Sequence, residues 1–104
     1  MINTFKNLLG IGPKVNYSQL VKNGAIIVDV RSKEEFSGGH IKGSINTSVD
    51  TLKNNLNKLN KDKVIITCCA SGMRSASAKS MLKSSGFNEV YNGGGWSSLN
   101  GKVN

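Results

Sequence analysis

Residues 64–86 read VIITCCASGMRSASAKSMLKSSG and decide the fold. The β-branched run Val64–Cys68 predicts a buried strand, because stiff branched side chains suit a pleated surface. The next residues include the i, i+3, i+4 spacing of a helix face, formed by Ala76, Ala78, Met81 and Leu82. Gly86 predicts a left-handed end to that helix. Cys69 therefore lies between the end of a strand and the start of a helix.

This position favours an ionised thiol at Cys69. The first amides of a helix have no partner within the helix, and they lie at the positive end of its dipole, so both stabilise a nearby anion. A thiolate is such an anion. Gly72 allows the loop to turn its amides inward, and Arg74 offers a fork of donors suited to an oxyanion such as a thiosulfonate or phosphate. The loop thus predicts a cysteine nucleophile beside an anion site.

Length, charge and cysteine number restrict the remaining possibilities. A chain of 104 residues predicts a single domain over residues 1–104 with a true hydrophobic core. The net charge of +8 favours anionic partners, but the lysines are scattered and no basic helix or aromatic platform accompanies them, so nucleic-acid binding is not expected. Two adjacent cysteines exclude a disulfide framework and lack the spacing of a metal site. A free reactive thiol predicts a cytoplasmic protein.

The N-terminal part predicts two short helices. Ile2, Phe5, Leu8 and Leu9 have helical spacing, so residues 1–13 are interpreted as an extension or short helix that stops before Pro13. This segment is too short and too interrupted for a signal peptide or a membrane span, and no membrane association is expected. Asn16 begins a second predicted helix, over residues 17–23, which ends at Gly24.

Strands and helices alternate along the rest of the chain. The further predicted strands are residues 25–30, 44–47 and 87–92. Ser32 and Glu35 form a capping box for a brief helix through Phe36. A helix capped by Asp50 or Thr51 follows, with one buried stripe made of Leu52, Leu56 and Leu59. The run Gly93–Gly95 frees the backbone, and a terminal helix is predicted over residues 97–100.

This alternation predicts an α/β fold. Right-handed crossovers give a parallel sheet that helices cover on both faces. Sites in such folds lie at the carboxyl ends of the strands. Cys69 and Asp29 both lie at such ends.

Residues 14–100 resemble the rhodanese family. The resemblance rests on four motifs: Asp29-Val30-Arg31 with Glu35-Phe36, Gly39-His40-Ile41-x-Gly43-Ser44-Ile45-Asn46, Cys69-x-x-Gly72-x-Arg74-Ser75, and Gly93-Gly94-x-Trp96. Where many relatives have a proline after the asparagine, this chain has Thr47-Ser48. The resemblance implies a rhodanese-like three-layer α/β fold, in which a central parallel sheet of four to five strands has helices on both faces.

The resemblance implies a sulfurtransferase that needs no cofactor. Cys69 would take the outer sulfur of a donor such as thiosulfate, and the persulfide would pass it to cyanide, a thiol or a sulfur-accepting protein. The persulfide would be cradled by the substrate-binding loop, which consists of Ala70, Ser71, Gly72, Met73, Arg74 and Ser75.

Four residues outside the loop are interpreted as support for it: Asp29, Arg31, Glu35 and His40. Arg31 and Glu35 are also spaced for an ordinary ion pair on a helix. His40 has a second interpretation as a general base, but a histidine among glycines more often stabilises a turn.

Some alternatives stay open for the loop and its surroundings. Arg74 is spaced either to contact an anion or to pair with a carboxylate, and Cys68 is interpreted as a packing residue or as a resolving partner for oxidised Cys69. Trp96 is expected in the core or in a pocket wall rather than stacked on a substrate.

Two other functions use the same reactive loop. A cysteine phosphatase or arsenate reductase also needs a thiolate, inward amides and an arginine, but its pattern has one residue more than the four between Cys69 and Arg74. A non-catalytic sulfur carrier or interaction module would need the same loop as the enzyme.

Overall fold

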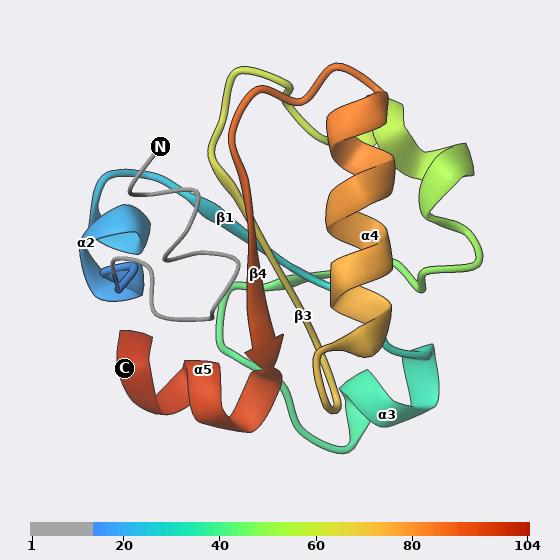
Figure 1. Ribbon diagram of the computed structural model, residues 1–104. Helices are drawn as coiled ribbons and strands as arrows, with labels where there is room; N and C mark the ends of the chain where they lie inside the picture. Colours follow the sequence, from blue (N-terminus) through green and yellow to red (C-terminus); the bar gives the residue numbers. More distant parts are fainter. Residues whose placement is uncertain (1–13) are drawn as a thin grey trace.

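The computed structural model describes residues 14–104 and has alternating helices and strands (Figure 1). In chain order the elements are α2 (Tyr17–Lys22), β1 (Ile26–Asp29), α3 (Lys33–Ser37), β2 (Ile45–Asn46), the 3₁₀ helix η1 (Leu52–Lys58), β3 (Ile65–Cys69), α4 (Met73–Ser84), β4 (Val90–Gly95) and α5 (Trp96–Val103). The helix predicted at residues 2–9 lies outside the described residues. No helix in the described part of the chain has the length and apolar character needed to cross a membrane.

The four strands form one parallel sheet in the order β2-β1-β3-β4. Val28 of β1 lies opposite Ile45 on one side and Thr67 on the other. Because all strands run the same way, their carboxyl ends meet at one edge of the sheet. Asp29 of β1 and Cys68 of β3 are partners there, which places Cys69 at this edge. The predicted α/β fold with a parallel sheet is therefore confirmed.

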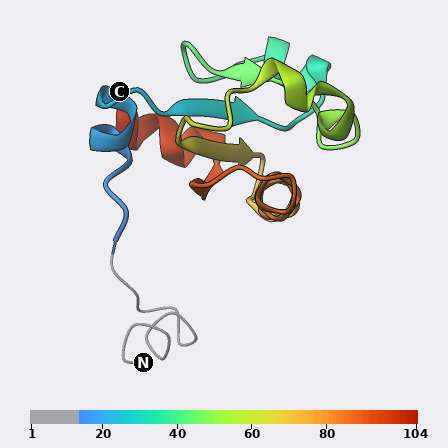
Figure 2. The ribbon, with the colours of Figure 1, turned by 90° about the horizontal axis from the view of Figure 1, so that it is seen from above.

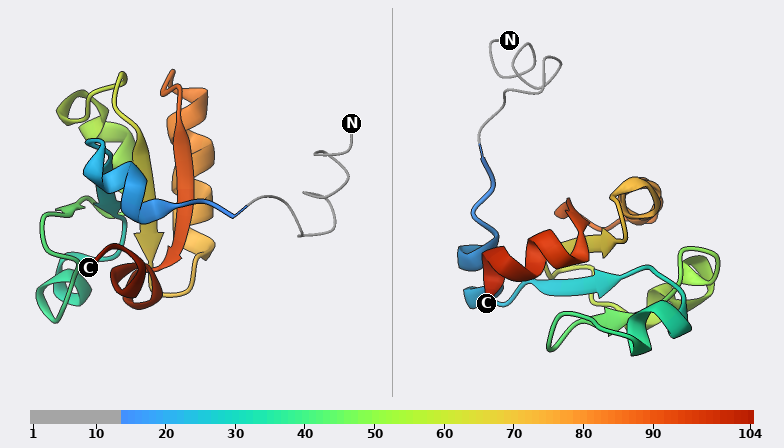
Figure 3. Two further views of the ribbon diagram at one scale, coloured as in Figure 1. Left: turned by 90° about the vertical axis from the view of Figure 1, so that its left-hand side faces the viewer. Right: turned by 90° about the horizontal axis from the view of Figure 1, so that it is seen from below.

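Helices cover both faces of the sheet, as expected. Figures 1 and 2 show α4 and η1 on one side and α2 and α5 on the other, and the left view of Figure 3 shows α2 in front of the strands and α4 behind them. The first face buries Val28, Leu52 and Leu82 in one apolar cluster. The second buries Ile66 and Leu99 in another. The period of two in a strand sends Cys68 into the second cluster and Cys69 into the first.

The leucine stripe forms a 3₁₀ helix where an α-helix was predicted. Leu52 and Leu59 are buried and Leu56 packs against them, so the predicted apolar face is confirmed. The segment LKNNLNK is rich in asparagine, which has low helix propensity and whose side chain competes for backbone groups. Asn55 donates to the Thr51 carbonyl at 2.9 Å. Thr51 precedes η1 but makes no capping bond with its side chain.

The last strand and the buried face of α4 also differ from the prediction. The last strand runs over Val90–Gly95, so Gly93–Gly95 belong to the sheet and the strand does not begin at Phe87. Glycine fits at position 93, whereas a β-carbon there would lie only 2.8 Å from Leu99. The buried face of α4 consists of Ser75, Ala78 and Leu82, whereas Ala76 is exposed. The apolar character of Ala76 was misleading, because the three buried positions follow the i, i+3, i+7 period of one helix face.

Local signals for helix ends are confirmed. Ser32 and Glu35 satisfy each other's backbone amides in a complete capping box. The side chain of Asn16 accepts from the Gln19 amide at the start of α2. Gly86, which follows α4, has the left-handed φ of 96° that the helix end requires.

Candidate active site

Cys69 ends β3 at the carboxyl edge of the sheet, and α4 begins four residues later at Met73. A register shift between Thr67 and Cys69 brings Cys69 opposite Gly95 of β4. Gly72 precedes the helix with φ 105°, a left-handed conformation that a residue with a β-carbon adopts only with strain. The sharp strand-to-helix turn points the first amides of α4 back toward Cys69.

Two of these amides contact the sulfur directly. The Gly72 N–H donates to Cys69 Sγ at 2.9 Å, and the Ser75 N–H donates at 3.3 Å. The Cys69 thiol donates to Ser75 Oγ, with Sγ and Oγ 3.4 Å apart. Burial raises the pKa of the Cys69 thiol, since its side chain is 1 % exposed, but the hydrogen bonds from Ser75 and Gly72 outweigh burial and lower the pKa overall. The geometry therefore favours an anionic sulfur.

Asn92 of β4 holds this turn in place, and the sequence reasoning missed it. Its side-chain oxygen accepts from Ser75 Oγ at 2.6 Å and from the Gly94 amide at 2.9 Å. Its side-chain nitrogen donates to the Gly72 carbonyl at 3.2 Å. The only signal in the sequence was an amide side chain at the end of a predicted strand, just before the glycine run.

Arg74 pairs with Glu35 of α3. Its two terminal nitrogens donate to the two carboxylate oxygens at 2.8 and 3.0 Å. The Arg74 guanidinium, and after it the Ser32 amide, lower the pKa of the Glu35 carboxyl to about 2. Glu35 thus contacts both the capping box of α3 and the loop that follows Cys69. The predicted contact of Arg74 with an anion stays a prediction, and in this structure its partner is a carboxylate.

Asp29 and Arg31 form a buried ion pair. Arg74 of the loop takes no part in it, because its partner is Glu35. Arg31 donates to both carboxylate oxygens of Asp29, with the shortest contact at 2.8 Å. It also donates to the carbonyls of Gly39 and Glu35, and its guanidinium lies 4.7 Å from the ring centroid of Trp96. The alternative ion pair between the Arg31 and Glu35 side chains is not formed. Arg31 instead binds one carbonyl within α3, the helix that carries Glu35, and one just after it.

His40 stabilises a turn. Its Nδ1 lies 2.8 Å from the Phe36 carbonyl, and its ring stacks on the Phe36 ring with centroids 3.7 Å apart. The side chain is exposed. Of its two interpretations, these contacts favour the structural one.

Cys68 packs in the apolar core on the opposite face of the sheet from Cys69. Its neighbours there include Ile27, Ile66 and Leu99. Burial, reinforced by the negative charge of Asp29, raises the pKa of Cys68 to about 12. A fully buried neutral thiol on the other face favours the packing role over that of a resolving partner.

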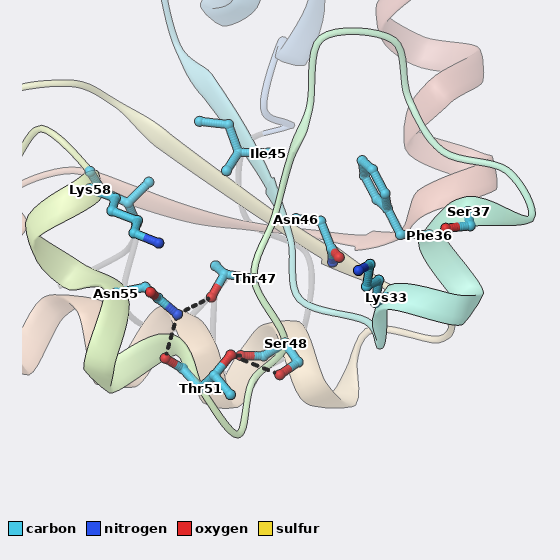
Figure 4. Close-up of a pocket in the computed structure, with 11 residues that line it drawn as sticks. Lys33, Phe36, Ser37, Ile45, Asn46, Thr47, Ser48, Thr51, Asn55 and Lys58 are labelled. Atoms are coloured by element: carbon cyan, nitrogen blue, oxygen red, sulfur yellow. Dashed lines mark hydrogen bonds between the residues drawn. The ribbon is translucent and has the colours of Figure 1, made fainter.

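An open cleft of about 560 Å³ lies beside β2, away from the loop (Figure 4). Its walls come from α3, β2 and η1, with Phe36, Ile45 and Leu59 among the lining side chains. None of residues 69–75 lines it. In residues 14–104 no group of three His, Cys, Asp or Glu side chains is placed to hold a metal ion.

Comparison with known proteins gives a consistent family. The model of the rhodanese-like domain matches residues 14–102. The chain is 37 % identical over 73 residues to the thiosulfate sulfurtransferase GlpE of Ectopseudomonas mendocina, covering 70 % of this chain and 67 % of that protein. It is 38 % identical over 80 residues to the uncharacterised protein YqhL of Bacillus subtilis, covering 76 % of this chain and 64 % of that protein.

Solved structures agree with this comparison. A rhodanese-like domain protein from Staphylococcus aureus superposes with a TM-score of 0.66 at 33 % identity, over 91 % of this chain and 83 % of that one. The reduced CoADR-RHD protein of Bacillus anthracis superposes with a TM-score of 0.74 at 36 % identity, over 94 % of this chain but only 18 % of that one.

Proposed function

The chain belongs to the rhodanese-like domain family, and we propose that it is a sulfurtransferase of the thiosulfate type that works through a persulfide on Cys69. The observation that carries the proposal is the set of donors around Cys69 Sγ, which are the amides of Gly72 and Ser75. These donors are fixed before any substrate arrives, so they stabilise negative charge on sulfur without further reorganisation. The similarity to a thiosulfate sulfurtransferase supports the same chemistry.

In the first step the Cys69 thiolate attacks the outer sulfur of thiosulfate. A bond forms between Sγ and that sulfur, and the sulfur–sulfur bond of the donor breaks, so that sulfite leaves with the electron pair and Cys69 carries a persulfide anion. Only 1 % of the Cys69 side chain is exposed, which favours a donor whose reactive end is a single atom. Among the positively charged residues, Arg74 is nearest to Cys69 in the sequence. It would contact the departing sulfite and give up part of its pairing with Glu35.

In the second step an acceptor removes the sulfur. Cyanide or a thiolate attacks the outer persulfide sulfur, the bond to Sγ breaks, and its electron pair returns to Cys69 as a thiolate. Thiocyanate or a new persulfide leaves. Neither step requires a cofactor, and two half-reactions joined by a covalent intermediate give ping-pong kinetics. We propose that this exchange takes place in the cytoplasm and that a protein thiol is a further acceptor.

Replacement of the nucleophile tests the proposal. Cys69→Ser is expected to abolish transfer from thiosulfate to cyanide, and mass spectrometry after thiosulfate treatment should find one added sulfur atom on Cys69 of the native chain. Cys68→Ser is the matched control and should keep most of the activity, because Cys68 lies on the other face of the sheet. Activity in Cys69→Ser, or no added sulfur on Cys69, would refute the proposed mechanism.

The two alternatives make different predictions. A sulfur carrier would form the persulfide but turn over small acceptors slowly, and a protein partner would bind only the sulfur-loaded form. A cysteine phosphatase would hydrolyse an aryl phosphate. The spacing of four residues between Cys69 and Arg74 favours sulfur transfer over the phosphatase.

A further inference from the structure

Asn92 competes with Cys69 for one hydrogen atom. The Ser75 hydroxyl has a single hydrogen, yet its oxygen lies 2.6 Å from the Asn92 side-chain oxygen and 3.4 Å from Cys69 Sγ. The hydroxyl also lies 3.1 Å from the Gly72 carbonyl. A hydroxyl donates to one strong acceptor at a time while its lone pairs accept from others. The state of the sulfur therefore decides which acceptor receives the hydrogen.

The orientation of the Asn92 amide is fixed by its backbone partners. The Gly94 N–H is only a donor, so the atom 2.9 Å from it has to be the amide oxygen. The Gly72 carbonyl is only an acceptor, so the atom 3.2 Å from it has to be the amide nitrogen. A flipped amide would break both bonds. The oxygen of Asn92 consequently always faces Ser75.

Two hydrogen-bonding arrangements follow from this geometry. When Cys69 is a thiol, its hydrogen points to Ser75 Oγ and the hydroxyl hydrogen points to Asn92. When Cys69 is a thiolate, the hydroxyl has to rotate toward the sulfur, because a lone pair facing the anion would repel it. Asn92 then keeps only the Gly94 amide as donor to its oxygen. The carboxamide thus stabilises the thiol arrangement relative to the thiolate arrangement.

We propose that Asn92 is a positioning residue that sets the thiolate fraction of Cys69 by holding the Ser75 hydroxyl hydrogen away from the sulfur until the anion forms. The proposal deepens the proposed function and rests on it only in taking Cys69 as the nucleophile. It assigns Asn92 an effect opposite to that of a simple support. Loss of a support would loosen the amides and raise the pKa of Cys69, whereas loss of a competitor for the hydrogen lowers it.

Other charged groups around Cys69 do not depend on Asn92. Arg74 at the start of α4 interacts electrostatically with the sulfur and is paired with Glu35 of α3. Cys68 is neutral below its pKa of about 12, and the Asp29–Arg31 pair at the end of β1 balances its own charges. A change at Asn92 therefore reports on the hydroxyl hydrogen with these charges held constant.

The test is a double-mutant cycle on the full chain. The pKa of Cys69 is measured from the pH dependence of its alkylation by iodoacetamide, and mass spectrometry identifies the modified peptide. Asn92→Ala is expected to lower the Cys69 pKa by about 0.5 to 1 unit, as removal of one competing hydrogen bond implies. Ser75→Ala should raise it. In the Ser75→Ala background, Asn92→Ala should have no effect, since no hydroxyl is left to share. Asn88→Ala on the exposed surface is the matched control and should leave the pKa unchanged.

A raised pKa in Asn92→Ala, or the same shift with and without Ser75, would overturn the proposal and leave Asn92 as a structural support. If Asn92→Ala does not fold, nuclear magnetic resonance of the native chain answers the same question. The Asn92 carboxamide and Gly94 amide signals should titrate together with Cys69, and should stay constant in Cys69→Ser. Constant signals in the native chain would refute the proposal. Neither measurement depends on sulfur transfer. Failure of this inference can therefore be distinguished from failure of the proposed function.

Discussion

Gly93→Ala should destabilise the chain because the space beside β4 is already filled. An added β-carbon at Gly93 would lie 2.8 Å from a Leu99 methyl group, 2.9 Å from an Ile66 methyl group and 2.9 Å from the Thr67 carbonyl oxygen. Contacts this short force side chains or backbone to move, which costs about 1 to 3 kcal/mol in a packed core. The smaller entropy of the unfolded alanine chain offsets about 0.4 to 1 kcal/mol of this. We expect a net loss of roughly 1 to 2 kcal/mol.

Urea denaturation followed by circular dichroism measures this change in the free energy of unfolding, and the melting temperature should fall by about 4 to 16 °C. Gly101→Ala is the matched control. Gly101 lies in α5 with no heavy atom within 4 Å of the added carbon, and alanine is the better helix former, so this variant should gain about 0.5 to 1 kcal/mol. If Gly93→Ala is as stable as the native chain, or if both variants change in the same direction, the packing argument is wrong.

Three further predictions concern the two ion pairs and the buried thiol of Cys68. Asp29→Ala leaves Arg31 buried without its partner and should cost about 3 to 5 kcal/mol in urea denaturation, whereas preserved stability would show that the pair adds little. The pKa of Glu35 is lowered to about 2 in the folded chain, so its contribution to stability is present above the unfolded pKa of about 4.5. This contribution is lost as the pH falls from about 4.5 toward 2. Glu35→Gln should remove this part of the acid dependence of the melting temperature. Cys68→Ser should lower the melting temperature, because it places a hydroxyl in an apolar core. It should leave alkylation of Cys69 unchanged, because the two thiols lie on opposite faces of the sheet. A large loss of alkylation would contradict this separation.

Much of the fold was predictable from local patterns. The apolar runs of β1 and β3 and the alternation of strands with helices indicated a parallel sheet, and the capping box at Ser32 and Glu35 fixed the start of α3. These signals act within a few residues of one another, so the sequence contains them directly. The errors arose where local propensity and tertiary packing disagree, as in the asparagine-rich η1 and in the glycine run of β4, which belongs to the sheet and lies close to Leu99 of α5.

The position of Cys69 followed from local signals in the sequence, whereas the residues around it did not. Three neighbouring local elements are enough to bring amides to the sulfur: a strand that ends at Cys69, a turn at Gly72 and a helix that begins at Met73. The contacts between Ser75 and Asn92, 17 residues apart, and between Arg74 and Glu35, 39 residues apart, depend on which strands are neighbours and in what register.

The sequence by itself therefore determined that residue 69 would be a thiol between the end of a strand and the start of a helix, because strand, turn and helix signals all lie within the same short stretch. Only the tertiary structure decided which carboxylate Arg74 would meet and which amide would hold Ser75. Several asparagines and acids along the chain have suitable chemistry, and the choice among them is made by the sheet, which brings the carboxyl ends of distant strands to one edge.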